Sequence, residues 1–141
     1  SPSSAASDVY KRQVVEETMI LPDEAKALKA QLIRMADGRQ VNLVLTTGGT
    51  GFSPRDITPE ATCAIADRNA PGIAEAMRYH SLSITPRGML SRGVSVLRGK
   101  TLIVNLPGSP KAVQENLEYI LPSLEHGVRI AAGLDGECAR K

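Results

Sequence analysis

The sequence of 141 residues has few aromatic residues, no strong excess of charge and no long apolar run. It contains one phenylalanine, three tyrosines and no tryptophan, and its formal net charge of +2 arises without a basic run. Nucleic-acid-binding proteins need basic surface for phosphates and aromatic rings for base stacking, so this composition argues against that class. No apolar stretch approaches the roughly 20 residues that span a bilayer. Cys63 and Cys138 show no ligand-like spacing, which fits a reduced, cytosolic protein.

A glycine-rich loop is the most informative segment that is present. Residues 46–52 read Thr-Thr-Gly-Gly-Thr-Gly-Phe and follow an apolar run over residues 41–45. Glycine has no β-carbon and adopts positive φ, so such a loop lets backbone N–H groups surround an anion. Arg55 and Asp56 follow and add a fixed cation and a hard carboxylate suited to Mg²⁺. The combination indicates a site for a phosphorylated ligand, and a plain strand-to-helix turn is the alternative interpretation.

Two widespread phosphate-binding motifs are absent from this loop. The P-loop ends in Gly-Lys-Ser/Thr, whereas no lysine lies between Val41 and Thr62. The dinucleotide fingerprint started at Gly49 meets Pro54 where its last glycine belongs. Started one residue earlier, it meets Thr50 at its second glycine, so the loop follows neither pattern.

The order of predicted strands and helices indicates an α/β fold. Residues 14–21 and 41–45 have the apolar character of strands, and a helix is expected from Pro22 to Ala36. Residues 94–97 and 101–106 flank Arg98-Gly99-Lys100 and predict a hairpin. Further helices are expected from a Thr58 cap to a break at Pro71-Gly72, over residues 73–79, and over residues 113–131 with a kink at Pro122. This pattern predicts a three-layer αβα sandwich with a mostly parallel sheet.

Two loops are expected to share one edge of this sheet. In sheets of this class, ligands bind beyond the carboxyl ends of the strands. The glycine-rich loop and a second loop, residues 105–111, both follow strands. Asp23 follows the first predicted strand and should therefore open on the same edge as Asp56. Two converging carboxylates would suit Mg²⁺, whereas the alternative for Asp23 is an acid that stabilises a helix N-terminus.

Residues 46–62 resemble the signature of the molybdopterin adenylyltransferase family, which includes MogA-like enzymes and the G domain of gephyrin. The similarity extends in order and with family-like spacing over residues 14–133, through the following stretches: Pro71-Gly72, Ser81, Thr85-Pro86, Met89-Leu90-Ser91-Arg92, Arg98-Gly99-Lys100 and residues 105–111. It implies a molybdopterin-binding-domain fold and a nucleotidyltransferase of molybdenum cofactor biosynthesis. Such an enzyme uses Mg-ATP to adenylate the terminal phosphate of molybdopterin and releases pyrophosphate.

The resemblance also implies roles for individual residues. It makes Asp23 and Asp56 catalytic carboxylates that hold Mg²⁺. The nucleotide and phosphate loop comprises Gly48, Gly49, Thr50 and Gly51; the pterin side comprises Ser81, Ser91 and Asn105; and the second loop contributes Pro107, Gly108 and Ser109. Arg55 either assists the phosphates or forms a structural ion pair, and His80 and His126 are expected to be surface or packing residues.

The front of the chain departs from the family pattern. Family members begin with a strand that ends in Ser-Asp, followed by a loop and a helix, where this chain has the polar, serine-rich residues 1–13. We therefore expect an unstructured, non-native tail over residues 1–13, a domain over 14–133 that lacks its first strand, and a C-terminal tail over 134–141. Loss of a buried parallel strand costs on the order of several kcal/mol, so we expect weak or no activity.

The resemblance further implies a cytoplasmic homotrimer that acts on small molecules, with a molybdenum-insertion protein as a further partner. No feature of the sequence indicates nucleic acid or a membrane as a partner. Two alternatives stay open. A non-catalytic molybdopterin-binding or assembly module would not need Asp23 and Asp56, and a nucleotide-hydrolysing relative of the same fold would turn over a nucleotide without pterin. The presence of both acids favours the transferase.

Overall fold

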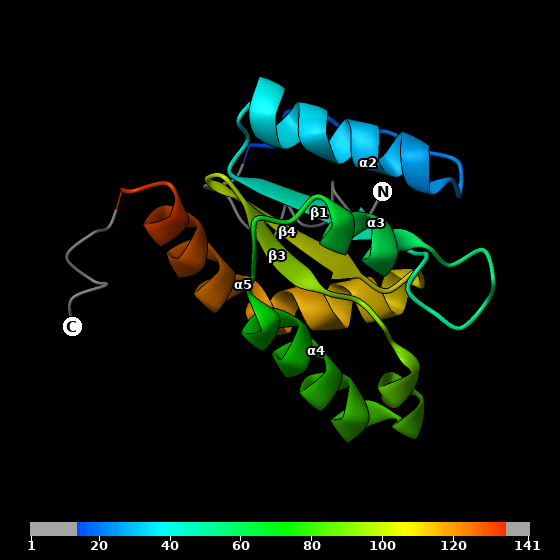
Figure 1. Cartoon of the computed structure of the whole chain (residues 1–141). Coiled ribbons are helices and arrows are strands. Elements are labelled where there is room, and N and C mark those ends of the chain that lie inside the picture. The colour runs from blue at the N-terminus through cyan, green and yellow to red at the C-terminus, as the bar shows by residue number, and fades with distance from the viewer. Residues whose placement is uncertain (1–13, 135–141) are drawn as a thin grey trace.

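The computed structural model describes residues 14–134, in which helices and strands alternate as an α/β fold requires (Figure 1). The expected tail over residues 1–13 lies outside the described residues, as does all of the C-terminal tail except Leu134. The elements in chain order are α2 (Ala25–Ile33), the π-helical turn η1 (Arg34–Gly38), β1 (Leu43–Thr47), α3 (Thr58–Ala64), β2 (Arg68–Asn69), α4 (Pro71–Ile84), the 3₁₀ turn η2 (Pro86–Leu90), β3 (Ser95–Arg98), β4 (Thr101–Leu106) and α5 (Pro110–Ala131).

The sheet is mixed rather than mostly parallel. Its four strands are ordered β1-β4-β3-β2. β1 is parallel to β4, with Leu43 opposite Leu102 and Thr47 opposite Leu106, whereas β3 is antiparallel to both β4 and β2. The hairpin between β3 and β4 is confirmed, and it reverses the chain at Gly99, whose φ is +55°. The α/β class is therefore confirmed. The sheet is mixed because the tight turn at Gly99 joins β3 and β4 and makes them antiparallel.

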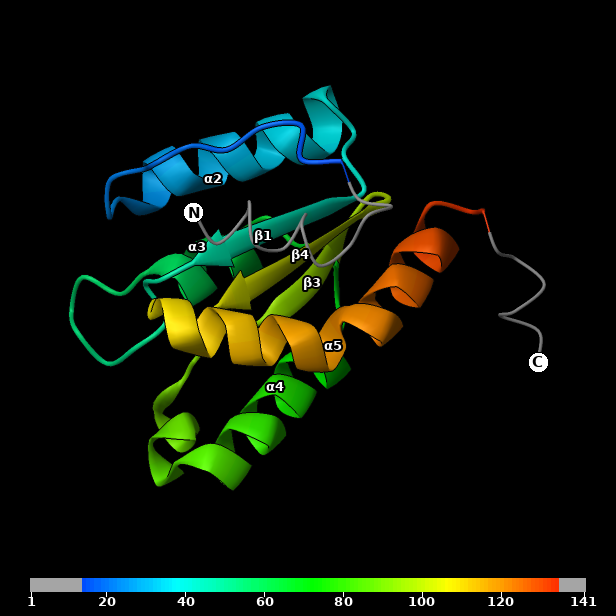
Figure 2. The same cartoon turned by 180° about the vertical axis from the view of Figure 1, so that it is seen from behind.

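Helices cover both faces of the sheet, as the three-layer prediction requires (Figures 1 and 2). Side chains alternate between the two faces of a strand, and β4 is buried along its whole length. Its residues Leu102, Val104 and Leu106 pack in one cluster with α4 and α5, while Ile103 packs in a second cluster with Leu32 of α2. Two apolar cores, one on each face, therefore hold the carboxyl end of β4 in place.

Proline marks helix starts rather than breaks in this chain. The sequence predicts that Pro71-Gly72 ends a helix, but α4 begins at Pro71 and continues to Ile84. Proline suits the first turn because the N–H group that it lacks would have no partner inside the helix. A helix start at this point is confirmed, but α3 begins at Thr58 itself. Its N-cap position is Ile57 and no side chain caps it, so the prediction of a Thr58 cap is wrong. Helix α5 contains Pro122 within its 22 residues.

The prediction of a strand over residues 14–21 is wrong for the described structure. The segment runs alongside α2 (Figure 2). Ion pairs of Glu16 and Glu17 join it to Arg34, the first residue of η1, and to Arg39, which follows η1. A strand exists only where a neighbour accepts and donates its backbone hydrogen bonds. Instead, a groove of about 1190 Å³ is lined by both this segment and β1. Within residues 14–134, β1 pairs with β4 alone.

Candidate functional site

The two glycine-bearing loops meet at the carboxyl ends of β1 and β4. Because these strands are parallel and in register, the loops that follow Thr47 and Leu106 leave the sheet side by side. The N–H of Gly48 donates to the carbonyl of Leu106 at 3.1 Å. A β-carbon built on Gly108 would lie 3.4 Å from Cα of Gly48. The expectation that both loops share one edge is thereby confirmed.

The first loop needs glycine for both its conformation and its packing. Gly48 and Gly49 have φ values of +86° and +71°, which residues with a β-carbon rarely adopt. The carbonyl of Gly49 accepts a hydrogen bond from the N–H of Thr58 at 3.1 Å. A β-carbon on Gly49 would overlap the hydroxyl of Thr58. The start of α3 is therefore packed directly against this turn.

A run of unpaired backbone donors follows from this conformation. Within residues 14–134, the N–H groups of Gly49, Thr50, Gly51 and Phe52 donate to no protein atom. Successive backbone N–H groups in a turn with left-handed residues can converge on an anion, and N–H groups without protein partners have that capacity free. The structure therefore supplies the donors that the glycine pattern predicts.

Asp56 closes the same loop. Its Oδ2 accepts a hydrogen bond from the N–H of Ser53 at 2.9 Å, and its own N–H donates to the carbonyl of Ser53 at 2.9 Å. A β-carbon on Gly51 would lie 2.9 Å from the same Oδ2, so the carboxylate lies directly against that glycine. One carboxylate oxygen thus shapes the loop, and the other takes part in no hydrogen bond or ion pair among the described residues.

Arg55 precedes Asp56 on the exposed part of the loop. Its backbone N–H donates to the hydroxyl of Ser53 at 3.4 Å. Its guanidinium forms no ion pair or hydrogen bond with any residue that the structure describes. The interpretation of Arg55 as a structural ion-pair partner is therefore wrong here, and its charge is available to a ligand.

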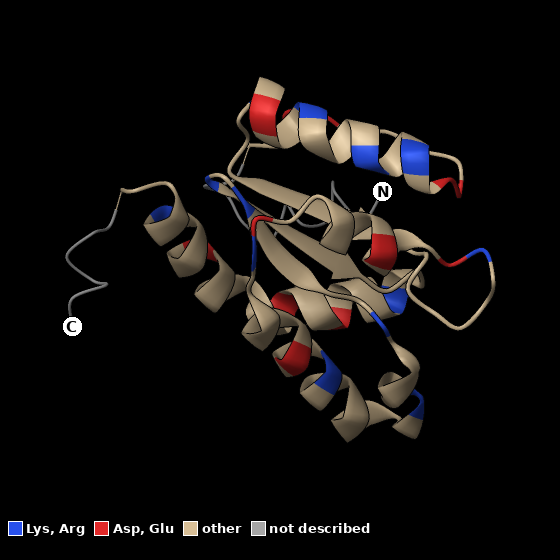
Figure 3. Ribbon diagram, in the orientation of Figure 1, with Lys and Arg blue, Asp and Glu red and all other residues tan. Residues whose placement is uncertain are grey.

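Asp23 lies at the groove beside β1. It lines this groove together with Gly48 and Gly49, whereas Asp56 is not part of the lining. Figure 3 shows acidic residues both near the start of α2 and in the loop after β1. The N-cap position of α2 is Glu24, so Asp23 does not cap the helix. Over residues 14–134, no group of three or more His, Cys, Asp or Glu side chains is placed to hold a metal ion.

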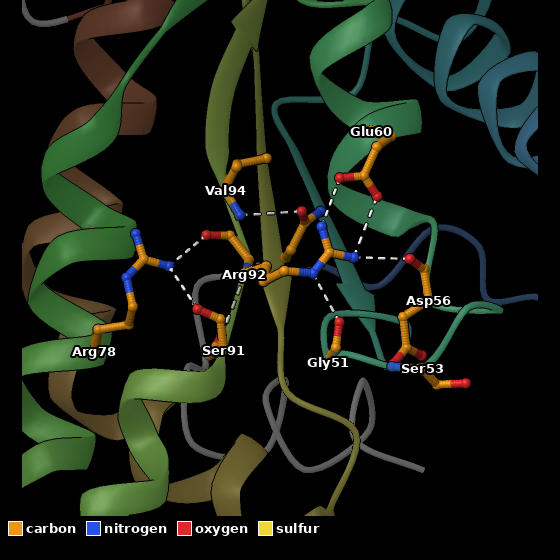
Figure 4. A network of polar contacts seen from close by, with 10 residues as sticks. Gly51, Ser53, Asp56, Glu60, Arg78, Ser91, Arg92 and Val94 are labelled. Carbon is orange, nitrogen blue, oxygen red and sulfur yellow. Dashed lines mark hydrogen bonds and ion pairs between the residues drawn. The ribbon is translucent and has the colours of Figure 1, made fainter.

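Arg92 ties the loop to α3 (Figure 4). Its Nε donates to the carbonyl of Gly51 at 2.7 Å, and Nη2 donates to the carbonyl of Asp56 at 2.8 Å. Nη1 pairs with Oε2 of Glu60 at 2.6 Å, and this hydrogen bond lowers the pKa of that carboxyl below its usual range. The family resemblance includes Arg92 in the stretch Met89-Leu90-Ser91-Arg92 but assigns it no role, because the sequence does not show that Gly51, Asp56 and Glu60 lie within its reach.

Asn105 is a buried residue whose side chain links several elements of the fold. It is 1 % exposed at the end of β4. Its Nδ2 donates to the hydroxyls of Thr46 at 3.0 Å and Thr62 at 3.1 Å, and its Oδ1 accepts from the N–H of Val94 at 3.1 Å. These bonds engage both ends of the amide, so they support a role in joining β1, α3 and β3 and do not by themselves support contact with a ligand.

The remaining residues to which the resemblance assigns a role differ in whether their side chains link elements of the fold or lie near the surface. The hydroxyl of Ser81 donates to Oδ1 of Asn116 at 3.1 Å, which joins α4 to α5. Ser91 is half-buried, and its hydroxyl accepts from the N–H of Gly93 at 3.4 Å. Ser109 caps α5 by accepting from the N–H of Ala112 at 3.2 Å, and Pro107 precedes it in the second loop. His80 stacks on Tyr119 with ring centroids 4.2 Å apart, as expected for a packing residue.

Comparison with known proteins identifies the family of this chain. The family model described as "Probable molybdopterin binding domain" matches residues 11–126. The chain belongs to this family. A molybdopterin adenylyltransferase of Haemophilus influenzae is 51% identical over 104 residues, which cover 74% of this chain and 53% of that relative. The chain therefore spans about half the length of this relative. None of the described helices is long and apolar enough to cross a membrane.

Solved structures show the same fold. The molybdopterin biosynthesis enzyme MoaB of Thermus thermophilus is 52% identical with a TM-score of 0.75, over 79% of this chain and 70% of that one. The molybdopterin biosynthesis Mog protein of Mycobacterium ulcerans is 37% identical with a TM-score of 0.82, over 93% of this chain and 84% of that one. The fold expected from the resemblance is thus confirmed.

Proposed function

We propose that this domain adenylates molybdopterin with Mg-ATP. The observation that carries the proposal is the run of free N–H groups over residues 49–52, next to the second glycine loop and closed by Asp56. A relative that is 51% identical is named molybdopterin adenylyltransferase, which agrees with the chemistry of this site. Two phosphate-bearing substrates suit two glycine loops that touch at one sheet edge.

The reaction requires that two anions approach each other. A terminal phosphate oxygen of molybdopterin attacks the α-phosphorus of ATP, a new P–O bond forms, and the bond to the bridging oxygen of the β-phosphate breaks to release pyrophosphate. Phosphoryl chemistry of this kind depends on positioning and charge neutralisation. The N–H groups of residues 49–52 would bind phosphate oxygens, and the unpaired guanidinium of Arg55 would neutralise charge.

Mg²⁺ fits the donor chemistry of the site. Asp56 keeps one carboxylate oxygen that bonds to no described residue, and the carboxylate of Asp23 makes no hydrogen bond or ion pair within residues 14–134. Hard carboxylate oxygens suit this cation, which commonly takes its other ligands from water and substrate phosphates. We propose that Asp56 and Asp23 hold it, where it would supply charge neutralisation between the phosphates.

The pterin side is proposed at the residues around the second loop. Ser91 is half-buried and Ser109 is exposed, and each carries a hydroxyl group. Pro107 and Gly108 form the turn between β4 and α5. Ser81 and Asn105 are proposed to act through the packing that their hydrogen bonds maintain. Hydroxyl groups both donate and accept, which matches the mixed donors and acceptors of a pterin ring.

The decisive experiment mixes the purified chain with molybdopterin and Mg-ATP and assays adenylylated molybdopterin and pyrophosphate. Asp56→Asn keeps an oxygen that can accept from Ser53 but removes the charge, so product formation should fall at least about a hundredfold. Asp37→Asn is the matched control, because Asp37 is an exposed carboxylate paired with Arg98 away from the loops. Equal activity of both variants would overturn the proposal. ATP consumed without pterin would instead favour the nucleotide-hydrolysing alternative, and pterin binding without product would favour the non-catalytic module.

We further propose that an additional apolar strand completes the sheet beside β1. The groove there is lined by Leu28 and Leu32 of α2 and by Leu117 and Leu121 of α5, so a strand within it would be covered on both faces. Fusing the first strand and helix of a relative ahead of Val14 should raise the melting temperature by several degrees and increase turnover. A fusion that melts at the same temperature as the present chain would contradict this proposal.

A homotrimer is proposed from exposed apolar side chains. They cluster in sequence at the end of α4 and in η2, and they are Tyr79, Leu82, Ile84, Met89 and Leu90. Contiguous exposed apolar surface commonly marks a contact with another subunit. Sedimentation of the wild type and of Leu82→Glu would test this, since the variant should be monomeric. A cytoplasmic setting and an interaction with a molybdenum-insertion protein remain predictions.

A further inference from the structure

We propose that Arg92 is a positioning residue that sets the direction of the free N–H groups in the glycine-rich loop. The inference rests on the proposed function, because it concerns how the same loop binds phosphate. Arg92 lies at the end of the segment that leads into β3, forty-one positions after Gly51 along the chain. Figure 4 shows its side chain between the loop and the first turn of α3.

Arg92 binds three carbonyl groups of the glycine-rich loop. Its backbone N–H donates to the carbonyl of Thr50 at 2.8 Å. Its Nε donates to the carbonyl of Gly51 at 2.7 Å, and its Nη2 donates to the carbonyl of Asp56 at 2.8 Å. One residue therefore fixes both ends of residues 51–56, the part of the loop that carries the carboxylate.

The planar peptide bond links the direction of each of these carbonyls to that of the N–H group that follows it. In a trans peptide, the C=O of one residue and the N–H of the next point in opposite directions. The carbonyls of Thr50 and Gly51 point toward Arg92, so the N–H groups of Gly51 and Phe52 point away from it. Those two N–H groups belong to the run that makes no hydrogen bond within the described residues. Arg92 thus determines which side of the loop presents donors and which presents acceptors.

The charge of the Arg92 guanidinium is paired with the carboxylate of Glu60. Nη1 and Nη2 lie 2.6 and 3.3 Å from the two carboxylate oxygens of Glu60 in α3. This pairing balances the charge of Arg92 and holds the fork in one plane. Arg92 is therefore distinct from Arg55, whose guanidinium has no such partner. Its effect on a bound anion is exerted through the loop backbone.

The chain segment around Arg92 is itself fixed from two sides. Nη1 of Arg78 in α4 donates to the carbonyl of Gly93 at 2.7 Å. The N–H of Val94 donates to Oδ1 of Asn105 at 3.1 Å. A β-carbon on Gly93 would lie 3.1 Å from the carbonyl oxygen of Asn105, so the segment is packed against β4. Through Arg92, the glycine-rich loop is therefore held in a fixed position relative to the sheet.

A matched pair of variants separates positioning from stability. Arg92→Lys keeps the positive charge, but one ammonium group cannot reach Gly51, Asp56 and Glu60 with the geometry of the guanidinium fork. Arg98→Lys makes the same change at a similar site, because Arg98 binds Asp37 through Nε and Nη2 and the carbonyl of Ile65 through Nη1 at 2.7 Å. Arg98 lies outside the two glycine-bearing loops.

The experiment measures five quantities on the wild type and both variants: the melting temperature, the Kd for inorganic pyrophosphate by calorimetry, the ¹⁵N order parameters of residues 49–56, kcat, and KM for ATP. Arg92→Lys should weaken pyrophosphate binding about tenfold and lower the order parameters of the loop. It should lower kcat by up to about a hundredfold, since misplacement of about 1 Å has that effect. Arg98→Lys should leave the Kd and the loop order parameters unchanged at a similar loss of melting temperature.

The inference is overturned if the two variants show the same Kd and the same loop order parameters. Failure of the proposed function has a different signature, in which the wild type neither binds pyrophosphate nor forms adenylylated product. In that case the order parameters still test the positioning role, because they report the ps–ns mobility of the loop backbone without any ligand. Unchanged order parameters in Arg92→Lys would then reject the positioning role.

Discussion

Gly48 and Gly108 lie against each other at the point where the two glycine-bearing loops leave the sheet. A β-carbon on Gly108 would approach Cα of Gly48 to 3.4 Å. This contact exists because β1 and β4 are parallel neighbours in register, so that the residues after Thr47 and Leu106 emerge at the same height. The adjacency of the loops is therefore a property of strand order, and changes in either glycine should affect both loops.

Gly49→Ala should destabilise the protein more than Gly99→Ala. Both positions have positive φ, which costs a residue with a β-carbon about 1–2 kcal/mol. A β-carbon on Gly49 would also collide with the hydroxyl of Thr58, whereas a β-carbon on Gly99 has no atom within 4 Å. Urea denaturation of both variants measures the difference. Equal losses would show that the packing of α3 against the loop is not tight in solution.

Asn105→Ala should cost about 2–4 kcal/mol of unfolding free energy, because it leaves buried donors and acceptors without partners. The affected groups are the N–H of Val94 and the hydroxyls of Thr46 and Thr62. Asn69→Ala is the control, since Asn69 is exposed in β2 and should lose less than about 0.5 kcal/mol. Comparable melting temperatures for the two variants would contradict the role of the Asn105 side chain in linking these elements by hydrogen bonds.

Ser81→Ala should lower stability while leaving KM for molybdopterin unchanged. The hydroxyl of Ser81 donates to Oδ1 of Asn116, which is 2 % exposed and loses that partner in the variant. Chemical denaturation and steady-state kinetics measured on the same preparations distinguish the two roles. A raised KM with unchanged stability would instead support the direct pterin contact that the family resemblance implies.

Stability should fall in acid because three carboxylates at the protein surface are paired with arginines. Hydrogen bonds from arginine lower the pKa of Glu60, Asp37 and Glu17 in the folded protein. A carboxyl whose pKa is lower in the folded state contributes stability above its unfolded pKa, about 4, and this contribution is lost as the pH falls through the folded value. Urea midpoints should therefore be flat from pH 7 to 5 and decline below about pH 4.

The contribution of the Arg92–Glu60 ion pair to this loss of stability in acid can be measured. Glu60→Gln removes the titrating group, so the variant should lose less stability than the wild type between pH 5 and 3. Added salt should reduce the pH dependence of both proteins, because these pairs are exposed. Identical pH profiles for the variant and the wild type would contradict the assigned pairing.

The glycine pattern alone was sufficient to predict a loop with positive φ and unpaired backbone N–H groups. The positive φ values of Gly48 and Gly49 and the free N–H groups that follow are local properties, set by residues adjacent in the chain. The hairpin around Gly99 and the amphipathic α5 are local in the same sense, and both were predicted correctly. Local steric preferences and side-chain periodicity determine such features before any long-range contact forms.

Only the tertiary structure decided the features that depend on a distant partner. Residues 14–21 have the composition of a strand but form none, because no described strand lies beside them to complete the hydrogen bonds. Asn105 has the chemistry of a ligand contact, yet it is enclosed between Thr46 and Thr62, which come from other elements. Arg92 reaches the loop through three-dimensional proximity to Gly51 and Asp56. Backbone pairing, burial and charge pairing across the fold are set by which elements pack together, and for that reason a residue's type fixes its chemistry while its neighbours in space fix its role.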